Sequence, residues 1–264
     1  MVDEKMPLTK HLEELRHCLI VSVIAVTVGF CIAYAFKDRI FTFLAKPLID
    51  VLPQGSTLQY IGLAEAFITY IKIAFFAGIF LALPVILYEI WKFVSPGLHE
   101  HEKRYVIPFV IFSTIFFFGG ATFCYYVVFP FAFRFFLAFS DQSIRAMPAI
   151  KQYLTFITRL LFAFGVVFEM PILLFFLGRI GLVNHKWLAK KRGYAIVAIF
   201  IAAAVLTPGP DAVTQLLLAA PLLALYELSV LVVRLTGRKP PEEEEAEEKT
   251  ENKPDKKTGD ALAG

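Results

Sequence analysis

The chain has 264 residues, of which 58% are hydrophobic and 19% are charged, with a formal net charge of +3. Soluble domains average about a quarter charged residues, so this composition disfavours an ordinary soluble enzyme or a nucleic-acid-binding domain and indicates a membrane protein. The three cysteines have no C-x-x-C spacing, which disfavours disulfide bonds and a metal site.

Residues 1–17 are predicted to form a cytoplasmic amphipathic helix ahead of the first span. Leu8, Leu12 and Leu15 recur at helical spacing, and Pro7 suits a first helical position. We expect this helix to lie at the membrane surface and to run into the first span. The acidic residues of this leader and the length of the following apolar run disfavour a cleaved signal peptide.

Six apolar segments follow, and each is expected to cross the membrane as a helix. Approximate boundaries are 18–36, 67–91, 105–128, 154–178, 193–207 and 213–233. Lipid accepts only helices or closed barrels, and the alternating segments of a barrel are absent. The sequence therefore predicts an all-α integral membrane protein whose membrane domain, residues 18–235, is a six-helix bundle.

The connections differ in character. The segment 37–65 is too apolar for a disordered linker, so short helices are expected to form an outer cap, and 134–152 is expected to be a second outer structure. "TPGPD" at 207–211 predicts a tight turn. Spans five and six are expected to be short, because Glu227 interrupts the sixth. The charged segment 236–264 is predicted to be a disordered cytoplasmic tail.

Prolines recur in or beside the spans and predict kinked helices in a curved bundle. These prolines are Pro84, Pro108, Pro130, Pro171 and Pro221. The predicted inner segments carry more than twice as many Lys and Arg residues as the outer ones, so both termini are expected to be cytoplasmic.

Glu169 is a carboxylate inside an apolar run. The nearest charges, Arg159 and Arg179, are ten positions away on either side, about 15 Å along a helix, so Glu169 is expected near the membrane midplane. An ionised carboxylate there costs on the order of 3 kcal/mol. Two interpretations stay open: a hydrogen bond that joins helices, or a functional polar site in a wet cavity.

Two further carboxylates, Glu14 and Glu102, lie at the predicted cytoplasmic interface. Each has an ordinary explanation, because Glu14 can pair with Lys10 on a solvated helix face and Glu102 suits a helix N-terminus. Together they would suit a ligand with two guanidinium groups. "HEHE" at 99–102 lacks the spacing of a zinc motif. No catalytic motif is visible, so neither an enzyme nor a cofactor is expected.

Four stretches resemble the TatC family, the multispanning subunit of the twin-arginine protein translocase. They are "MPLTKHLEELR" at 6–16, "ALPVILYEIWKFVSPGLHEHEKR" at 82–104, "FGVVFEMP" at 164–171 and "LTPGPDAVTQLLLAAPLLALYE" at 206–227. The resemblance implies an inner-membrane receptor that binds twin-arginine signal peptides at the cytoplasmic face. It also implies export of folded proteins, driven by the proton-motive force, in a hetero-oligomer of several copies with single-span TatA- and TatB-type partners.

The resemblance also implies roles for particular residues. It assigns signal-peptide binding to Glu14 and Glu102, with Arg16 and Phe93 shaping the same patch, and it places Glu169 in a concave groove. Partner docking is implied for Thr207 and Gln215, and structural roles for Pro47, Pro84 and Asp211. "TPGPD" is one residue longer than the family's "TPPD" turn, and "RHCL" at 16–19 carries one positive charge fewer than the family stretch.

Two other functions remain as alternatives. One is a proton- or ion-coupled secondary transporter with Glu169 as its coupling site, although the inverted repeats typical of such proteins are not visible. The other is a scaffold for other membrane proteins.

Overall fold

The computed structural model describes residues 8–53, 58–59, 62–94, 106–139, 147–207 and 212–236. Their regular structure is helical, apart from an isolated bridge between Gln59 and Ala149. In chain order the elements are α1 (Leu8–Ala35), α2 (Lys37–Ile49), α3 (Glu65–Val94), α4 (Val106–Phe123), the π-helix η3 (Cys124–Val128), α5 (Phe129–Leu137), α6 (Ile150–Phe168), α7 (Met170–Arg179), α8 (His185–Lys190), α9 (Arg192–Leu206) and α10 (Ala212–Thr236).

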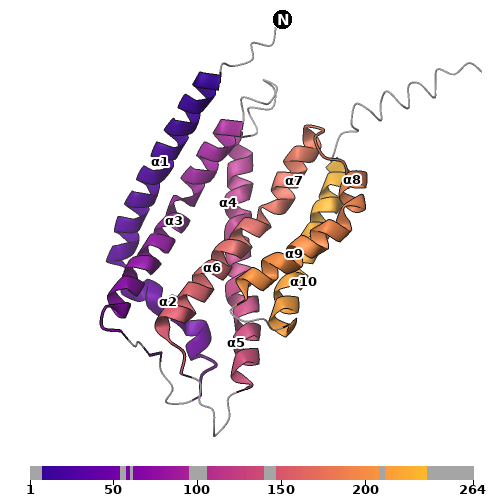
Figure 1. Cartoon of the computed structure of the whole chain (residues 1–264). Coiled ribbons are helices and arrows are strands. Elements are labelled where there is room, and N and C mark those ends of the chain that lie inside the picture. The colour runs from indigo at the N-terminus through magenta and orange to yellow at the C-terminus, as the bar shows by residue number, and fades with distance from the viewer. Residues whose placement is uncertain are drawn as a thin grey trace, which may run out of the picture.

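Five stretches of the described residues are long and apolar enough to cross a membrane. They are His11–Ala35, Glu65–Phe93, Val106–Leu137, Ile150–Arg179 and Ala212–Thr236. Helix α9 is apolar but has only 15 residues, about 22 Å of helix against a hydrocarbon core of about 30 Å. The start of α1 and the end of α10 lie at the same end of the bundle, whereas α2 lies at the opposite end (Figure 1).

Helix α1 continues without a break from Leu8 to Ala35, so the helix predicted ahead of the first span runs into that span. Two other predicted elements need correction. The third span does not end at residue 128, since helix continues to Leu137. The sixth span is not short, because α10 has 25 residues; the charge of Glu227 does not interrupt it, since this side chain forms an ion pair with Arg192.

The π-helix η3 explains how the third span passes Pro130. Proline cannot donate the i→i−4 hydrogen bond of an α-helix and its ring crowds the preceding turn. The wider turn is visible at the junction, where the Phe129 N–H donates to the Cys124 carbonyl five residues earlier. Pro130 then occupies the first turn of α5, where a missing N–H is tolerated. Helix therefore continues in place of the expected outer structure at 134–137.

Helices α1 and α3 pack against each other through two glycines. A Cβ built on Gly29 would lie 2.5 Å from the carbonyl oxygen of Gly78, and one on Gly78 would lie 2.5 Å from the nitrogen of Phe30. Only glycine permits backbones this close, as at small-residue contacts between membrane helices. This contact fixes the position of α1 on α3, and with it the seam that the two helices form at the end of the bundle where α1 begins and α3 ends.

Helix α2, at the end of the bundle opposite the start of α1, is held by two tyrosines. Pro47 lies inside α2 and lacks the N–H that would pair with the carbonyl of Phe43. The Tyr125 hydroxyl donates to that carbonyl at 2.7 Å. The Tyr153 hydroxyl donates to the next carbonyl, Leu44, also at 2.7 Å. Pro47 thus exposes a backbone acceptor to which η3 attaches.

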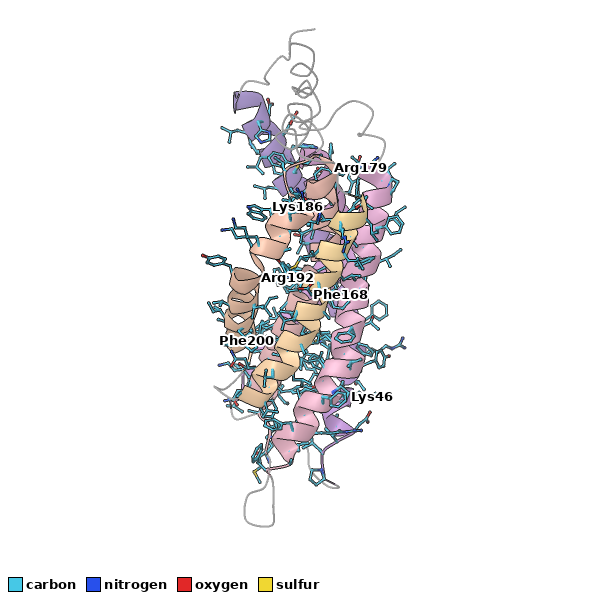
Figure 2. The ribbon with its side chains drawn as sticks, turned by 90° about the vertical axis from the view of Figure 1, so that its right-hand side faces the viewer. Lys46, Phe168, Arg179, Lys186, Arg192 and Phe200 are labelled. Atoms are coloured by element: carbon cyan, nitrogen blue, oxygen red, sulfur yellow. The ribbon has the colours of Figure 1, made fainter. Side chains whose placement is uncertain are left out.

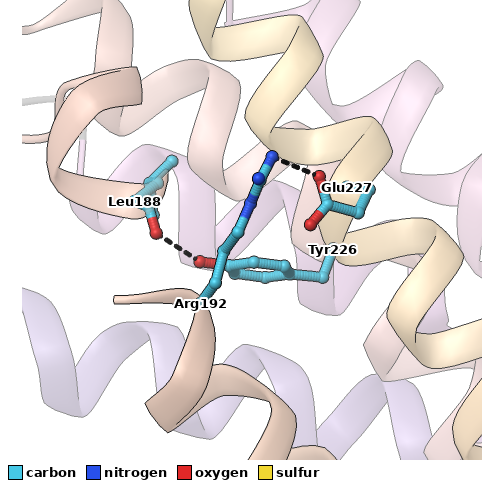
Figure 3. A network of polar contacts seen from close by, with 4 residues as sticks. All are labelled: Leu188, Arg192, Tyr226 and Glu227. Atoms are coloured by element: carbon cyan, nitrogen blue, oxygen red, sulfur yellow. Dashed lines mark hydrogen bonds and ion pairs between the residues drawn. The ribbon is translucent and has the colours of Figure 1, made fainter. Parts of the chain in front are cut away.

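The C-terminal helices are joined by α10. The Tyr226 hydroxyl donates to the Leu188 carbonyl of α8 at 2.8 Å, and Arg192 Nη2 lies 2.7 Å from Glu227 Oε2 (Figure 3). Figure 2 shows Arg192 at about the height of Phe168 and well below Lys186 and Arg179. The short helix α9 therefore begins partway along the bundle and not at its end. The Arg192–Glu227 ion pair attaches the first residue of α9 to α10.

Candidate functional site

Glu169 occupies a break between two helices. Helix α6 ends at Phe168 and α7 begins at Met170. The break is local, since the Glu169 N–H donates to the Val166 carbonyl at 3.1 Å and the Leu173 N–H donates to the Glu169 carbonyl at 2.9 Å. Pro171 in the first turn of α7 explains why the α-helical ladder stops here. The predicted kink is therefore at the carboxylate itself.

The Glu169 side chain is half-buried and incompletely satisfied. Its Oε1 is buried and has no hydrogen-bond partner among the described residues. Ser113 of α4 is a polar group that approaches this carboxyl group. Ser113 in turn accepts a hydrogen bond of 3.2 Å from Trp91 Nε1 of α3. Glu169, Ser113 and Trp91 thus form a polar cluster among three elements, and the sequence alone did not indicate the last two.

An apolar groove of about 380 Å³ lies apart from this polar cluster. Residues of α2, α3, α4, η3 and α6 line it, and its aromatic members are Phe43, Phe76, Phe80, Phe118, Tyr125 and Tyr126. Glu169 is not among its lining residues. The predicted concave groove around Glu169 is therefore a different feature from this one.

The other candidate site is the seam between α1 and α3, where Phe93 of α3 packs against the face of α1 that carries Glu14. The rings of His11 and Phe93 stack with centroids 4.4 Å apart. Glu14, half-buried, lies one turn after His11 and one turn before Cys18, so these three residues share a face of α1. Because His11 and Cys18 both contact α3, that face is the one turned toward α3. The structure thus places Glu14 and Phe93, two predicted residues from distant parts of the chain, at the same seam.

Glu89 lies in the same seam and was not predicted. This residue of α3 is 5% exposed, the Cys18 thiol of α1 lies against its carboxylate, and Lys92 Nζ lies 3.7 Å from its Oε2. The sequence offered a weak signal, a carboxylate among apolar residues in "LYEIWKF". Its pairing with Lys92 at i+3 made it resemble an ordinary interfacial ion pair.

The remaining predicted recognition residues are less constrained by the structure. Arg16 is exposed on α1. Glu102 lies outside the described residues, as does "HEHE" at 99–102. Within the described part of the chain, no group of three metal-ligating side chains occurs.

The predicted docking residues lie where α9 and α10 are connected. Thr207 ends α9, and its hydroxyl donates to the Ala204 carbonyl at 2.9 Å. Gln215 in the first turns of α10 donates from Nε2 to the Phe200 carbonyl at 3.0 Å. Both side chains are half-buried, and Gln215 joins the two helices. Asp211 lies outside the described residues, together with most of the predicted turn.

The two predicted structural prolines have different surroundings. Pro47 is buried in α2, where its missing N–H gives Tyr125 an acceptor. Pro84 lies inside α3, which continues through it, and its side chain is exposed. A structural role has support from contacts at Pro47, whereas at Pro84 it stays a prediction.

Comparisons with known proteins agree along nearly the whole chain. The family model described as Sec-independent protein translocase protein (TatC) matches residues 10–221. A protein named Sec-independent protein translocase protein TatC from Desulforapulum autotrophicum is 50% identical over 99% of this chain and 97% of its own length. One of the same name from Magnetococcus marinus is 46% identical over 94% and 91%. A crystal structure titled as the twin arginine translocase receptor TatC superposes with a TM-score of 0.78 at 40% identity, covering 86% of this chain and all of that one.

Proposed function

The chain belongs to the TatC family of multi-pass membrane proteins and is a receptor subunit of the Sec-independent, twin-arginine translocase, and we propose that it binds paired-arginine signal peptides at the seam of α1 and α3. It is a transport protein and not an enzyme. Membership of a translocase family along almost the full length also disfavours the ion-coupled transporter and the scaffold.

One observation supports the proposed binding site: Glu14 is half-buried and lies one helical turn after His11, whose ring stacks on Phe93 at one end of the bundle. A carboxylate in such a partly dehydrated seam accepts a guanidinium fork more strongly than one in open water. The neighbouring rings offer flat faces on which an Arg side chain can stack. Glu102 would supply the second carboxylate, and Arg16 would lie at the exposed rim.

The proposed topology has six spans, with α9 as the short fifth span. The protein would lie in the inner membrane with both termini in the cytoplasm. It is supported by the common end of the bundle at which α1 begins and α10 ends (Figure 1). The excess of Lys and Arg in the segments at that end also supports it. The predicted cytoplasmic tail, 236–264, lies outside the described residues except for Thr236.

Glu169 would be an intramembrane polar site that works through hydrogen bonding. Its buried Oε1 lacks a partner within the described residues, so an incoming polar group can satisfy it. A signal peptide's apolar helix or the helix of a partner subunit could supply that group. Thr207 and Gln215 would mark the edge at which TatA- and TatB-type single-span partners dock, beside the short helix α9.

Together these sites describe a subunit that recognises cargo at the surface and passes it to partners inside the membrane. Assembly of several copies and use of the proton-motive force would follow from its place in the translocase. The test is photo-crosslinking of a twin-arginine signal peptide to the full-length chain in membranes. Adducts from probes at Leu12 and Leu15, which flank Glu14, are expected, and adducts confined to the α2 end would overturn the proposed site.

A further inference from the structure

Glu89 is a third carboxylate that could bind a cation, in addition to Glu14 and Glu102, the two carboxylates of the proposed function. Its side chain is 6% exposed, and its Oε2 accepts no hydrogen bond from the residues that the structure describes. Buried carboxylates in proteins are normally satisfied by charge-assisted bonds of about 2.7–2.9 Å. Glu89 can therefore accept a further, better-placed donor.

Lys92 covers Glu89 without satisfying it. Its Nζ lies 3.7 Å from Glu89 Oε2 and 6.0 Å from the centroid of the Tyr88 ring, and its side chain is 48% exposed. The side chain of a helical residue lies over the turn that precedes it, so Lys92 leans across Glu89 from the solvent side. At 3.7 Å, beyond the 2.7–2.9 Å of a charge-assisted hydrogen bond, this ammonium group is a weak donor to Glu89.

The seam around Glu89 also contains the proposed recognition carboxylate. Cys18 of α1 lies against Glu89, and His11 stacks on Phe93. Glu14 lies between those two contacts on the same face of α1. Among the described residues, this seam holds the carboxylates of Glu14 and Glu89 and the ammonium group of Lys92, so a guanidinium group would add the second positive charge that these two carboxylates need.

We propose that Glu89 is a further binding residue for the paired arginines, and that Lys92 occupies its carboxylate until a guanidinium group displaces the ammonium. This inference rests on the proposed function. It also gives a reason for arginine selectivity. A planar guanidinium can form two parallel hydrogen bonds to a carboxylate, whereas an incoming lysine would only replace one point charge by another.

The experiment measures binding of two fluorescent peptides to the full-length chain in lipid nanodiscs. One peptide carries paired arginines and the other has lysines in both positions. The variants are Glu89→Gln, Lys92→Gln and Glu14→Gln. The matched control is Glu227→Gln, which makes the same change in an ion-paired glutamate on α10. Thermal melting of each variant reports whether it folds.

Glu89→Gln and Lys92→Gln are expected to change the affinity for the arginine peptide in opposite directions. Glu89→Gln should weaken binding of the arginine peptide by at least about ten-fold, since one charge-assisted pair is lost. Lys92→Gln should strengthen it several-fold, because the competing cation is gone. Both variants should lower the preference for arginine over lysine, and Glu227→Gln should leave binding unchanged.

Three results would overturn this inference or its premise, and they are distinguishable. Unchanged binding in Glu89→Gln, with binding lost in Glu14→Gln, removes Glu89 and leaves the proposed function intact. Weaker binding in Lys92→Gln means that the pair supports the seam structurally and is not opened by the peptide, which holds even if Glu89→Gln fails to fold. Equal binding of both peptides by the unaltered protein contradicts the proposed function itself.

Discussion

The hydroxyl of Tyr125 donates a 2.7 Å hydrogen bond to the carbonyl of Phe43, the acceptor that Pro47 leaves without an intrahelical donor. A residue in the π-helix η3 thus completes the backbone hydrogen bonding of α2. The relationship joins segments 82 positions apart in the chain and gives Pro47 a physical role.

This pairing predicts that the effect of Tyr125→Phe depends on Pro47. In the unaltered chain, the substitution should destabilise the protein by about 1 kcal/mol, because a part-buried carbonyl loses its donor. In a Pro47→Ala background the new N–H can take that carbonyl, so the loss should be clearly smaller. Thermal melting of the four proteins in detergent measures the coupling, and equal losses in both backgrounds would refute it.

The contact of Gly29 with Gly78 predicts that α1 and α3 cannot tolerate a methyl group between them. Gly78→Ala should destabilise the protein by about 1–3 kcal/mol, since the new Cβ would lie 2.5 Å from backbone atoms of α1. Gly119→Ala is the control, because nothing lies within 4 Å of a Cβ there. It should be neutral or slightly stabilising, since alanine favours helix. Equal melting temperatures would contradict the packing.

Glu169 should tolerate glutamine better than alanine. Glutamine keeps a carbonyl acceptor and adds an amide donor for the partner group that the buried Oε1 lacks among the described residues. Transport of a twin-arginine cargo into membrane vesicles should stay near the unaltered rate in Glu169→Gln and fall strongly in Glu169→Ala. Equal failure of both variants would instead indicate that an ionised carboxylate is required.

Partner docking beside Gln215 predicts a position-dependent disulfide crosslink. Leu216 is exposed near the start of α10, and Leu231 is exposed near its other end. A cysteine at position 216, paired with one in the membrane helix of a single-span partner, should give an adduct on oxidation. The same cysteine at position 231 should not, because it lies about four turns away. Adducts at 231 alone would place the partner elsewhere.

Features of the fold and of the candidate site could be predicted from the sequence where they depend on local contacts. Uncharged runs indicated the five long apolar helices of the described residues, and Glu169 stood out because charge is costly in lipid. Glu227 misled the prediction of a short sixth span, because its partner Arg192 lies 35 residues away. Burial of Glu89 could not be predicted either, since it depends on the packing of α1 over α3.

For the recognition residues too, local features could be predicted from the sequence, whereas contacts between distant segments could not. Composition and spacing suggested that Glu14 faces the cytoplasm, and the family resemblance added its role. Its neighbours at the seam could not be predicted, because the stacking of His11 on Phe93 joins two different helices. The π-helix η3 and the acceptor that Pro47 exposes likewise depend on three-dimensional contacts with other segments.

The central claim is that the Glu14 seam distinguishes guanidinium from ammonium groups. The most direct measurement compares dissociation constants of the paired-arginine and paired-lysine peptides for the unaltered protein and for Glu14→Gln. The arginine peptide should bind the unaltered protein roughly 10- to 100-fold more tightly than the lysine peptide, and Glu14→Gln should remove most of that difference. Equal affinities for the two peptides, or an unchanged ratio in Glu14→Gln, would contradict it.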